Sequence, residues 1–227
     1  GHRGAAALAP QNTLRGFARA IELGVDAVEL DVRLTSDGEL VVLHDEDVAA
    51  STNGTGLVGM MTLAQVRQLD AGQGERVPTF AEALSFLREK ALVVVDLKLP
   101  GYEEQEVRAL RAQRMLDASL VCTLLPGSLR RVKELAPDVF TAISYPEDKH
   151  GVGDNPRLAP VVSAVLAGMR ATLPWRIGGM MRQAGADGAM IYHKLVTPAL
   201  AQAVHRQNGF LGAWTVDTPE HIARVRA

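Results

Sequence analysis

Ala-Val-Glu-Leu-Asp-Val-Arg-Leu, at residues 27–34, is the stretch of sequence that decides the fold. Glu29 and Asp31 stand two residues apart, so a β-strand would send both carboxylates to the same face. Val28, Leu30 and Val32 around them are apolar, which indicates a strand buried on both faces, as in a parallel sheet. Paired buried carboxylates require a cation, and Mg²⁺ and Ca²⁺ are the ions that prefer oxygen ligands. The alternative is a half-buried strand with both acids in water, which fits these apolar neighbours poorly.

Similar short apolar runs alternate with amphipathic stretches along the chain, which predicts parallel strands joined by crossover helices. The expected strands are 27–34, 40–44, 92–97, 120–124, 139–144, 188–192 and 211–216. The expected helices are 12–23, 78–90, 103–116, 127–135, 157–170, 173–184, 198–208 and 219–226. Polar residues at several strand ends favour an α/β fold of the (β/α)8 TIM barrel class, because barrel strand ends converge on one mouth. We expect a single barrel domain over residues 1–227, with a small insertion at about residues 45–77.

Further polar side chains stand at the ends of the expected strands. Asp96 would complete a three-carboxylate metal site, with Lys98 on phosphate oxygens; an internal Asp96–Lys98 ion pair is the alternative. His44 ends the run 40–43 and opens into a polar loop, where binding groups commonly gather. Trp214 closes the last expected strand and predicts either a wall of the substrate pocket or core packing.

The start of the chain adds His2 and Arg3, and a guanidinium suits a bidentate hold on phosphate. Two histidines, an arginine and paired carboxylates therefore fall within the first fifth of the sequence. This grouping suggests phosphate-ester chemistry. Structural or solvent roles are expected for the remaining histidines, and a core position for Cys122. Those histidines are His150, His193, His205 and His221. Of these, His205 and His221 fall in amphipathic helices and are expected to be exposed.

The composition excludes several classes of partner. A formal net charge of −2 and an aromatic content of 4% give no basic field or stacking platform for nucleic acid. No apolar run reaches bilayer-spanning length, so no transmembrane segment is expected. A single cysteine excludes an internal disulfide and fits a reducing compartment, so we expect a cytoplasmic location. The expected partner is a small-molecule phosphodiester substrate, and the oligomeric state stays open.

Seven motifs, taken in order, resemble those of the glycerophosphodiester phosphodiesterase family, whose barrel is of the phospholipase C-like type. The resemblance covers essentially the whole chain. The motifs are His2-Arg3-Gly4, Ala9-Pro10-Gln11-Asn12-Thr13, Glu29-Leu30-Asp31, His44-Asp45, Thr52-Asn53-Gly54-Thr55-Gly56, Asp96-Leu97-Lys98 and Trp214-Thr215-Val216.

The resemblance implies a TIM barrel whose divalent ion, Mg²⁺ or Ca²⁺, is held by Glu29, Asp31 and Asp96. It also implies that Arg3 and Lys98 bind the substrate phosphate. The physical interpretation agrees, because a metal ion and two cations offset the charge of a phosphodiester and of its transition state.

His2 and His44 are, by the same resemblance, the general acid and base. One imidazole removes a proton from the attacking hydroxyl and the other protonates the leaving alkoxide. The implied activity is metal-dependent hydrolysis of glycerophosphodiesters to a glycerol phosphate and an alcohol. The sequence leaves open which histidine is the acid. It also leaves open whether a neighbouring glycerol hydroxyl attacks first and gives a cyclic phosphate.

The chain departs from the family pattern in three ways. The family usually has glutamate where this chain has Gln11, which removes a negative charge near the site. It usually has glutamate where this chain has Asp96, a carboxylate shorter by one methylene. Members also carry an apolar strand before the His-Arg-Gly run and another after the helix ending near Arg226. We therefore expect a barrel that lacks its first and last strands here, or that closes by other means.

Two alternative functions follow from these departures. The motifs ending in Lys98 and in Asp217 are closer to the spider-venom sphingomyelinase D enzymes, which share the barrel, but the run 10–13 and the cysteine count argue against that class. A non-catalytic phosphate-binding barrel is the other alternative. It is favoured by Gln11 and by the missing strands, and opposed by the presence of both His2 and His44.

Overall fold

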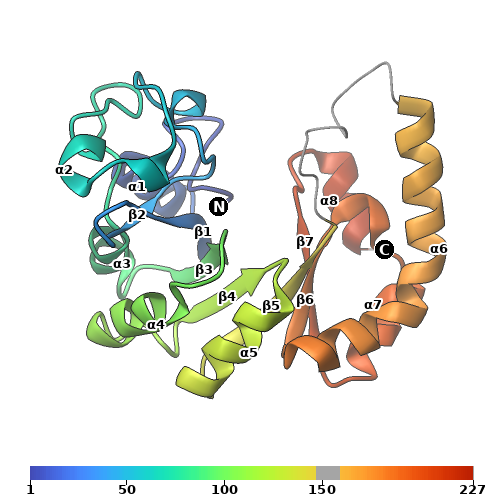
Figure 1. Cartoon of the computed structure of the whole chain (residues 1–227). Helices are drawn as coiled ribbons and strands as arrows, with labels where there is room; N and C mark the ends of the chain where they lie inside the picture. The colour runs from blue at the N-terminus through green and yellow to red at the C-terminus, as the bar shows by residue number, and fades with distance from the viewer. Residues whose placement is uncertain (147–158, 227) are drawn as a thin grey trace. The chain divides into compact units, whose positions relative to one another are not determined.

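The protein is described by a computed structural model that covers residues 1–146 and 159–226. These residues form two compact units (Figure 1). The first unit comprises residues 1–122 and 131–140, and the second comprises residues 123–130 and 141–227. Among the described helices, none combines the length and the apolar character that crossing a bilayer requires.

The sheet of the first unit is built around β1 (Ala27–Leu34), the strand quoted above. It pairs in parallel with β3 (Leu92–Leu97), which pairs in parallel with β4 (Ser119–Thr123). In the chain, helix α1 (Leu14–Glu22) precedes β1, α3 (Phe80–Leu87) precedes β3, and α4 (Glu103–Ala112) connects β3 to β4. Threonine side chains cap the starts of α1 and α3: Thr13 Oγ1 accepts from Gly16 N, and Thr79 Oγ1 accepts from Glu82 N.

β2 (Leu40–Val42) differs from the expected series of parallel strands. It pairs antiparallel with the end of β1, with Val32 opposite Val42. Only five residues separate β1 from β2, and a parallel crossover needs about a dozen or more. The chain instead turns back at Gly38, whose φ of 84° is in the left-handed region. β2 is therefore a hairpin partner of β1 and not one of the barrel strands.

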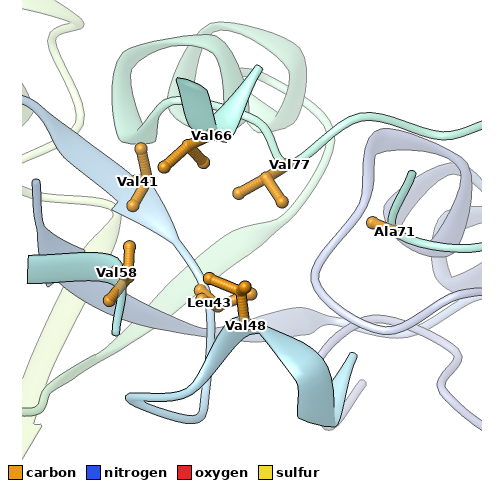
Figure 2. Packing of buried hydrophobic residues seen from close by; sticks show 7 residues of the cluster. All are labelled: Val41, Leu43, Val48, Val58, Val66, Ala71 and Val77. Atoms are coloured by element: carbon orange, nitrogen blue, oxygen red, sulfur yellow. The ribbon is translucent and has the colours of Figure 1, made fainter. Parts of the chain in front are cut away.

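The expected insertion follows β2 and contains three short helices, η1 (Val48–Ala50), η2 (Val58–Met60) and α2 (Leu63–Val66). A compact apolar cluster joins these helices to β2, and its side chains point toward a shared interior (Figure 2). Its members are Val41, Leu43, Val48, Val58, Val66, Ala71 and Val77. Because Leu43 is buried in this cluster, the backbone is fixed where His44 begins.

The second unit contains three parallel strands, β5 (Phe140–Tyr145), β6 (Gly188–Tyr192) and β7 (Phe210–Trp214). Its helical elements are α6 (Ala159–Ala184), η5 (His193–Leu195), α7 (Pro198–His205) and α8 (Pro219–Arg226), and α5 (Pro126–Leu135) precedes β5.

α6 was expected as two helices, 157–170 and 173–184, of which residues 157 and 158 lie outside the described part of the chain. It is instead a single helix that continues through Pro174. A proline inside a helix costs a hydrogen bond, but Leu173 and Ile177 on either side of it are fully buried. Packing therefore holds the helix together across the proline.

Within the described residues, β1, β3 and β4 are parallel to one another in the first unit, β5, β6 and β7 are parallel to one another in the second, and helices alternate with these strands along the chain. This pattern confirms the expectation of a (β/α)8 barrel class without its first and last strands. Gly1 lies along the edge of β1: its amino group donates to Ala27 O at 2.6 Å, and Glu29 N donates to Gly1 O at 2.7 Å. The segment that carries His2 and Arg3 therefore starts beside the strand that carries the carboxylates.

Candidate active site

Three carboxylates meet at β1 and β3, because the register of these strands places Asp31 opposite Asp96. Glu29 stands two residues earlier on the same face of β1. One oxygen of each of the three side chains lies within 4.8 Å of the others. Asp31 is 1% exposed, whereas Glu29 and Asp96 are partly exposed, so the cluster is open to water only through these two. The predicted gathering of Glu29, Asp31 and Asp96 is present.

Two cations lie against this cluster. Lys98 Nζ is 2.7 Å from Asp31 Oδ1 and 2.5 Å from Asp96 Oδ2, and Arg3 Nε is 3.5 Å from Asp31 Oδ2. The Asp96–Lys98 ion pair considered from the sequence therefore exists within the carboxylate cluster. Three carboxylates against two cations leave one excess negative charge if all five groups are ionised.

Of the three carboxylates, Glu29 is the one whose ionised form is least stabilised by its surroundings. Burial raises its pKa well above the usual range, and the charge of Asp31 raises it further, although Arg3 N donates to Glu29 Oε2 at 2.8 Å. Burial also opposes ionisation of Asp31, but the Lys98 ammonium holds the pKa of Asp31 below its ordinary value. Burial raises the pKa of Asp96, while the two aspartates raise that of Lys98 against the effect of its own burial.

This donor set fits a divalent cation of the hard type. All three candidate ligands are carboxylates, with oxygen atoms close enough to share one ion, and an added positive charge would stabilise the ionised form of Glu29. The donor atoms suit Mg²⁺ and Ca²⁺ equally, because both ions bind carboxylate oxygen.

The loop after His2 holds Arg3 in place. Arg3 has a φ of 51° and Gly4 a φ of 80°. A Cβ at residue 4 would lie 2.7 Å from the backbone of Gly16, so only glycine fits this close approach. Arg3 Nη1 donates to Gln11 Oε1 at 2.9 Å. Gln11 is thus a neutral acceptor for Arg3, a role that the sequence did not reveal.

Two further residues with no predicted role position the carboxylates and Lys98. Asn12 Nδ2 donates to Asp31 Oδ2 at 2.7 Å. The hydroxyl of Tyr102 donates to Val32 O at 2.7 Å and accepts from the backbone N of Lys98 at 3.0 Å. Asn12 belongs to a quoted motif and could have been noticed there, whereas nothing in the local sequence marks Tyr102.

The two candidate histidines differ in their surroundings. His44 Nδ1 lies 3.1 Å from Asp45 Oδ1, and Arg33 Nε donates to His44 O at 2.8 Å. Burial lowers the pKa of His44 below its ordinary value, although the charge of Asp31 opposes this. With Nδ1–H directed to a carboxylate, a neutral His44 carries its free lone pair on Nε2. His2 is exposed, and its backbone lies between Gly1 and Arg3, which both bond to β1.

A groove of about 580 Å³ adjoins Gln11. Its walls are residues 6–11, Ser51 and residues 71–73. None of these described lining residues is charged. Because Gln11 both lines the groove and binds Arg3, the groove begins at a predicted phosphate-binding side chain. The insertion contributes Ser51 and residues 71–73 to these walls.

The remaining candidates lie in the second unit. Trp214 ends β7, where its Nε1 donates to Met190 O at 3.0 Å and its ring lies 5.2 Å from that of Tyr192. Its proposed place in a substrate pocket stays a prediction. His193 is buried, and its ring lies 3.9 Å from that of His221. His221 is itself only partly exposed, so the expectation that it is exposed was wrong. His150 lies outside the described residues.

Comparison with known proteins identifies the family of the chain. The sequence profile of the "Glycerophosphoryl diester phosphodiesterase family" matches residues 2–227. The glycerophosphodiester phosphodiesterase of Caldanaerobacter subterraneus subsp. tengcongensis is 32% identical over 99% of this chain and 87% of that protein. Human glycerophosphodiester phosphodiesterase 1 is 29% identical over 96% of this chain and 71% of that protein.

Solved structures agree in fold. The crystal structure of a glycerophosphodiester phosphodiesterase from Agrobacterium tumefaciens matches with a TM-score of 0.74 and 25% identity, over 98% of this chain and 88% of that one. An Oleispira antarctica phosphodiesterase, solved with the product sn-glycerol-3-phosphate, matches with a TM-score of 0.79 and 22% identity, over 99% of this chain and 87% of that one. These likenesses confirm the predicted fold class. With a profile match from residue 2 to residue 227, the chain belongs to the glycerophosphoryl diester phosphodiesterase family.

Proposed function

We propose that this protein hydrolyses glycerophosphodiesters to a glycerol phosphate and an alcohol. The observation that carries the proposal is the close cluster of Glu29, Asp31 and Asp96, with Lys98 and Arg3 against it, in a chain of this family. The name of the relative from Caldanaerobacter and the glycerol phosphate bound to the Oleispira enzyme support the substrate and the product.

The three carboxylates would hold a divalent ion, Mg²⁺ or Ca²⁺, whose contribution is positive charge against the phosphate oxygens. Arg3 and Lys98 bind the remaining phosphate charge. Gln11 supports this role of Arg3, because it accepts a hydrogen bond from the guanidinium without cancelling its charge.

His44 is the general base in this proposal, and His2 the general acid. Burial favours the neutral form of His44, and Asp45 directs Nδ1–H away from the lone pair on Nε2. His44 takes the proton of the attacking hydroxyl as its oxygen bonds to phosphorus. The bond from phosphorus to the alcohol oxygen breaks, and His2 supplies the proton that this oxygen gains.

The alcohol portion of the substrate lies in the uncharged groove beside Gln11. The groove is continuous with the proposed phosphate site through Gln11, and its lining offers no charge to an ionic head group. We therefore expect neutral alcohols such as glycerol and inositol to be preferred over choline or ethanolamine.

The test is release of alcohol from glycerophosphodiesters of choline, ethanolamine, inositol and glycerol, and from lysophospholipids, after chelation and with Mg²⁺ or Ca²⁺ restored. Turnover should disappear with the ion and return with it. His2→Ala and His44→Ala should each abolish most turnover, while His205→Ala, at an exposed position of α7, should not. Tight binding of a diester without turnover, with either ion present, would contradict the proposal in favour of a binding domain.

A further inference from the structure

The helix α6 presents an apolar stripe on the side opposite its buried face. Its buried residues are Leu173, Ile177, Met181 and Ala184. At about 100° per residue, Val161, Val165, Thr172 and Trp175 fall on the opposite side, within an arc of about 80°. Val161 is 62% exposed, Val165 is 50% exposed and Trp175 is 89% exposed.

The stripe is long and belongs to a part of the helix that has no buried residue. All the buried side chains of α6 lie at or after Leu173, and the amino-terminal half extends past α7 (Figure 1, orange). From Val161 to Trp175 the stripe measures about 21 Å along the helix axis. Single exposed apolar residues are ordinary. A tryptophan aligned with two valines on an outward face indicates a contact surface.

The charges beside the stripe have one sign. The 26 residues of α6 include Arg170, Arg176 and Arg182 but no aspartate or glutamate, in a chain with 24 basic and 26 acidic residues. Arg176 and Arg182 lie about 60° to either side of the centre of the stripe. Arg182 donates to the neutral Gln207, and Arg176 stands over the ring of Tyr145. Among the residues that the structure describes, neither arginine has an ion-pair partner, so both keep their positive charge there.

We propose that this face of α6 docks on the surface of an anionic lipid bilayer. Val161, Val165 and Trp175 would enter the boundary between head groups and acyl chains, where indole rings are favoured. Arg176 and Arg182 would lie at the level of the lipid phosphates, which attract basic side chains. The uniform positive sign of α6 complements the negative surface of such a bilayer, which is the reason to expect lipid as the occupant.

The two tryptophans of the chain allow a direct test. Trp214→Phe leaves Trp175 as the single fluorescent indole. Its emission should shift to shorter wavelength when vesicles of phosphatidylcholine and phosphatidylglycerol are added, and much less with phosphatidylcholine alone. Flotation of the unmodified protein with the same vesicles gives the result without relying on the Trp214 variant.

Substitutions should separate the apolar contribution to vesicle binding from the electrostatic contribution. Trp175→Ala should weaken partitioning to anionic vesicles at least about tenfold, and Arg176→Gln or Arg182→Gln about fivefold each. Met60→Ala is the matched control, because Met60 is 78% exposed and lies in the first unit. Equal flotation of the Trp175→Ala protein, or none of the unmodified protein, would overturn the proposal. So would a blue shift that appears without lipid and grows with protein concentration, because the face would then contact a second copy.

Discussion

Replacing Glu106 by glutamine should stabilise the protein at neutral pH. Glu106 lies on α4 with 0% exposure, and among the described residues neither of its carboxyl oxygens has a hydrogen-bond partner. Burial raises the pKa of Glu106 well above its usual range, and the charges of Glu103 and Asp96 raise it further. The native state therefore favours the protonated form.

The sign and the size of the effect follow from linkage. An unfolded glutamate has a pKa of about 4.3. Above that pH the unfolded chain releases a proton that the folded chain keeps, so the free energy of unfolding falls as pH rises. The fall is about 1.4 kcal/mol per pH unit until the folded pKa is reached, which limits it to about 4 kcal/mol at pH 7. Near pH 4 and below, the contribution vanishes.

Glu106→Gln removes this pH dependence but keeps a similar volume. We expect the variant to exceed the parent in stability by about 2–4 kcal/mol at pH 7, and to approach it near pH 4. For a chain of this size each kcal/mol shifts Tm by about 2–4 °C. Thermal unfolding should be followed by circular dichroism between pH 4 and pH 8. Glu104→Gln is the control, since Glu104 is on the same helix with a side chain 62% exposed. If the difference in Tm between the parent and the Glu106→Gln variant stayed constant from pH 4 to pH 8, the reasoning would be refuted.

Three predictions concern activity. His44→Ala should lower kcat by about 10²–10⁴-fold. In the profile of kcat/KM against pH, the parent should lose activity on the acidic side only below pH 6.5, because burial lowers the pKa of His44 and only its neutral form is a base. Loss of activity that begins above that pH would contradict this role. Gln11→Ala should raise KM about tenfold with little change in Tm, while Gln11→Glu, which keeps an acceptor for Arg3, should bind better than the alanine variant; equal KM values would exclude positioning by Gln11. Ala7→Asp should improve kcat/KM for a choline diester over a glycerol diester about fivefold, with Ala7→Asn as the neutral comparison; an unchanged ratio would place the head group elsewhere.

The carboxylate cluster was predictable because it depends on two rules of sheet geometry. Alternation put Glu29 and Asp31 on one face, and the apolar neighbours implied a central strand. The same pattern ending in Asp96 predicted a second strand end, and parallel strands bring such ends together. The bounds of β1, β3 and β6 follow the expected ranges for this reason.

Other features depend on contacts across long sequence separations, which no local pattern encodes. Tyr102 bonds to Val32, 70 residues away, and its sequence context resembles any loop before a helix. The sequence predicts two helices where the structure has one, α6, because the burial of side chains around Pro174 outweighs the tendency of proline to end a helix. His221 was placed in water because α8 looks amphipathic by itself, yet His193 of η5 covers one side of its ring.

The position of Lys98 links folding of the first unit to the proposed chemistry. Its ammonium contacts Asp31 and Asp96, so it neutralises them before any ligand arrives. A buried carboxylate without a cation costs several kcal/mol, so loss of Lys98 would destabilise the unit as well as weaken phosphate binding. Inactivity of a Lys98 variant therefore cannot by itself assign the lysine to catalysis. His44 and Gln11 are only partly buried and neutralise no carboxylate of the cluster, so their variants can separate chemistry from stability.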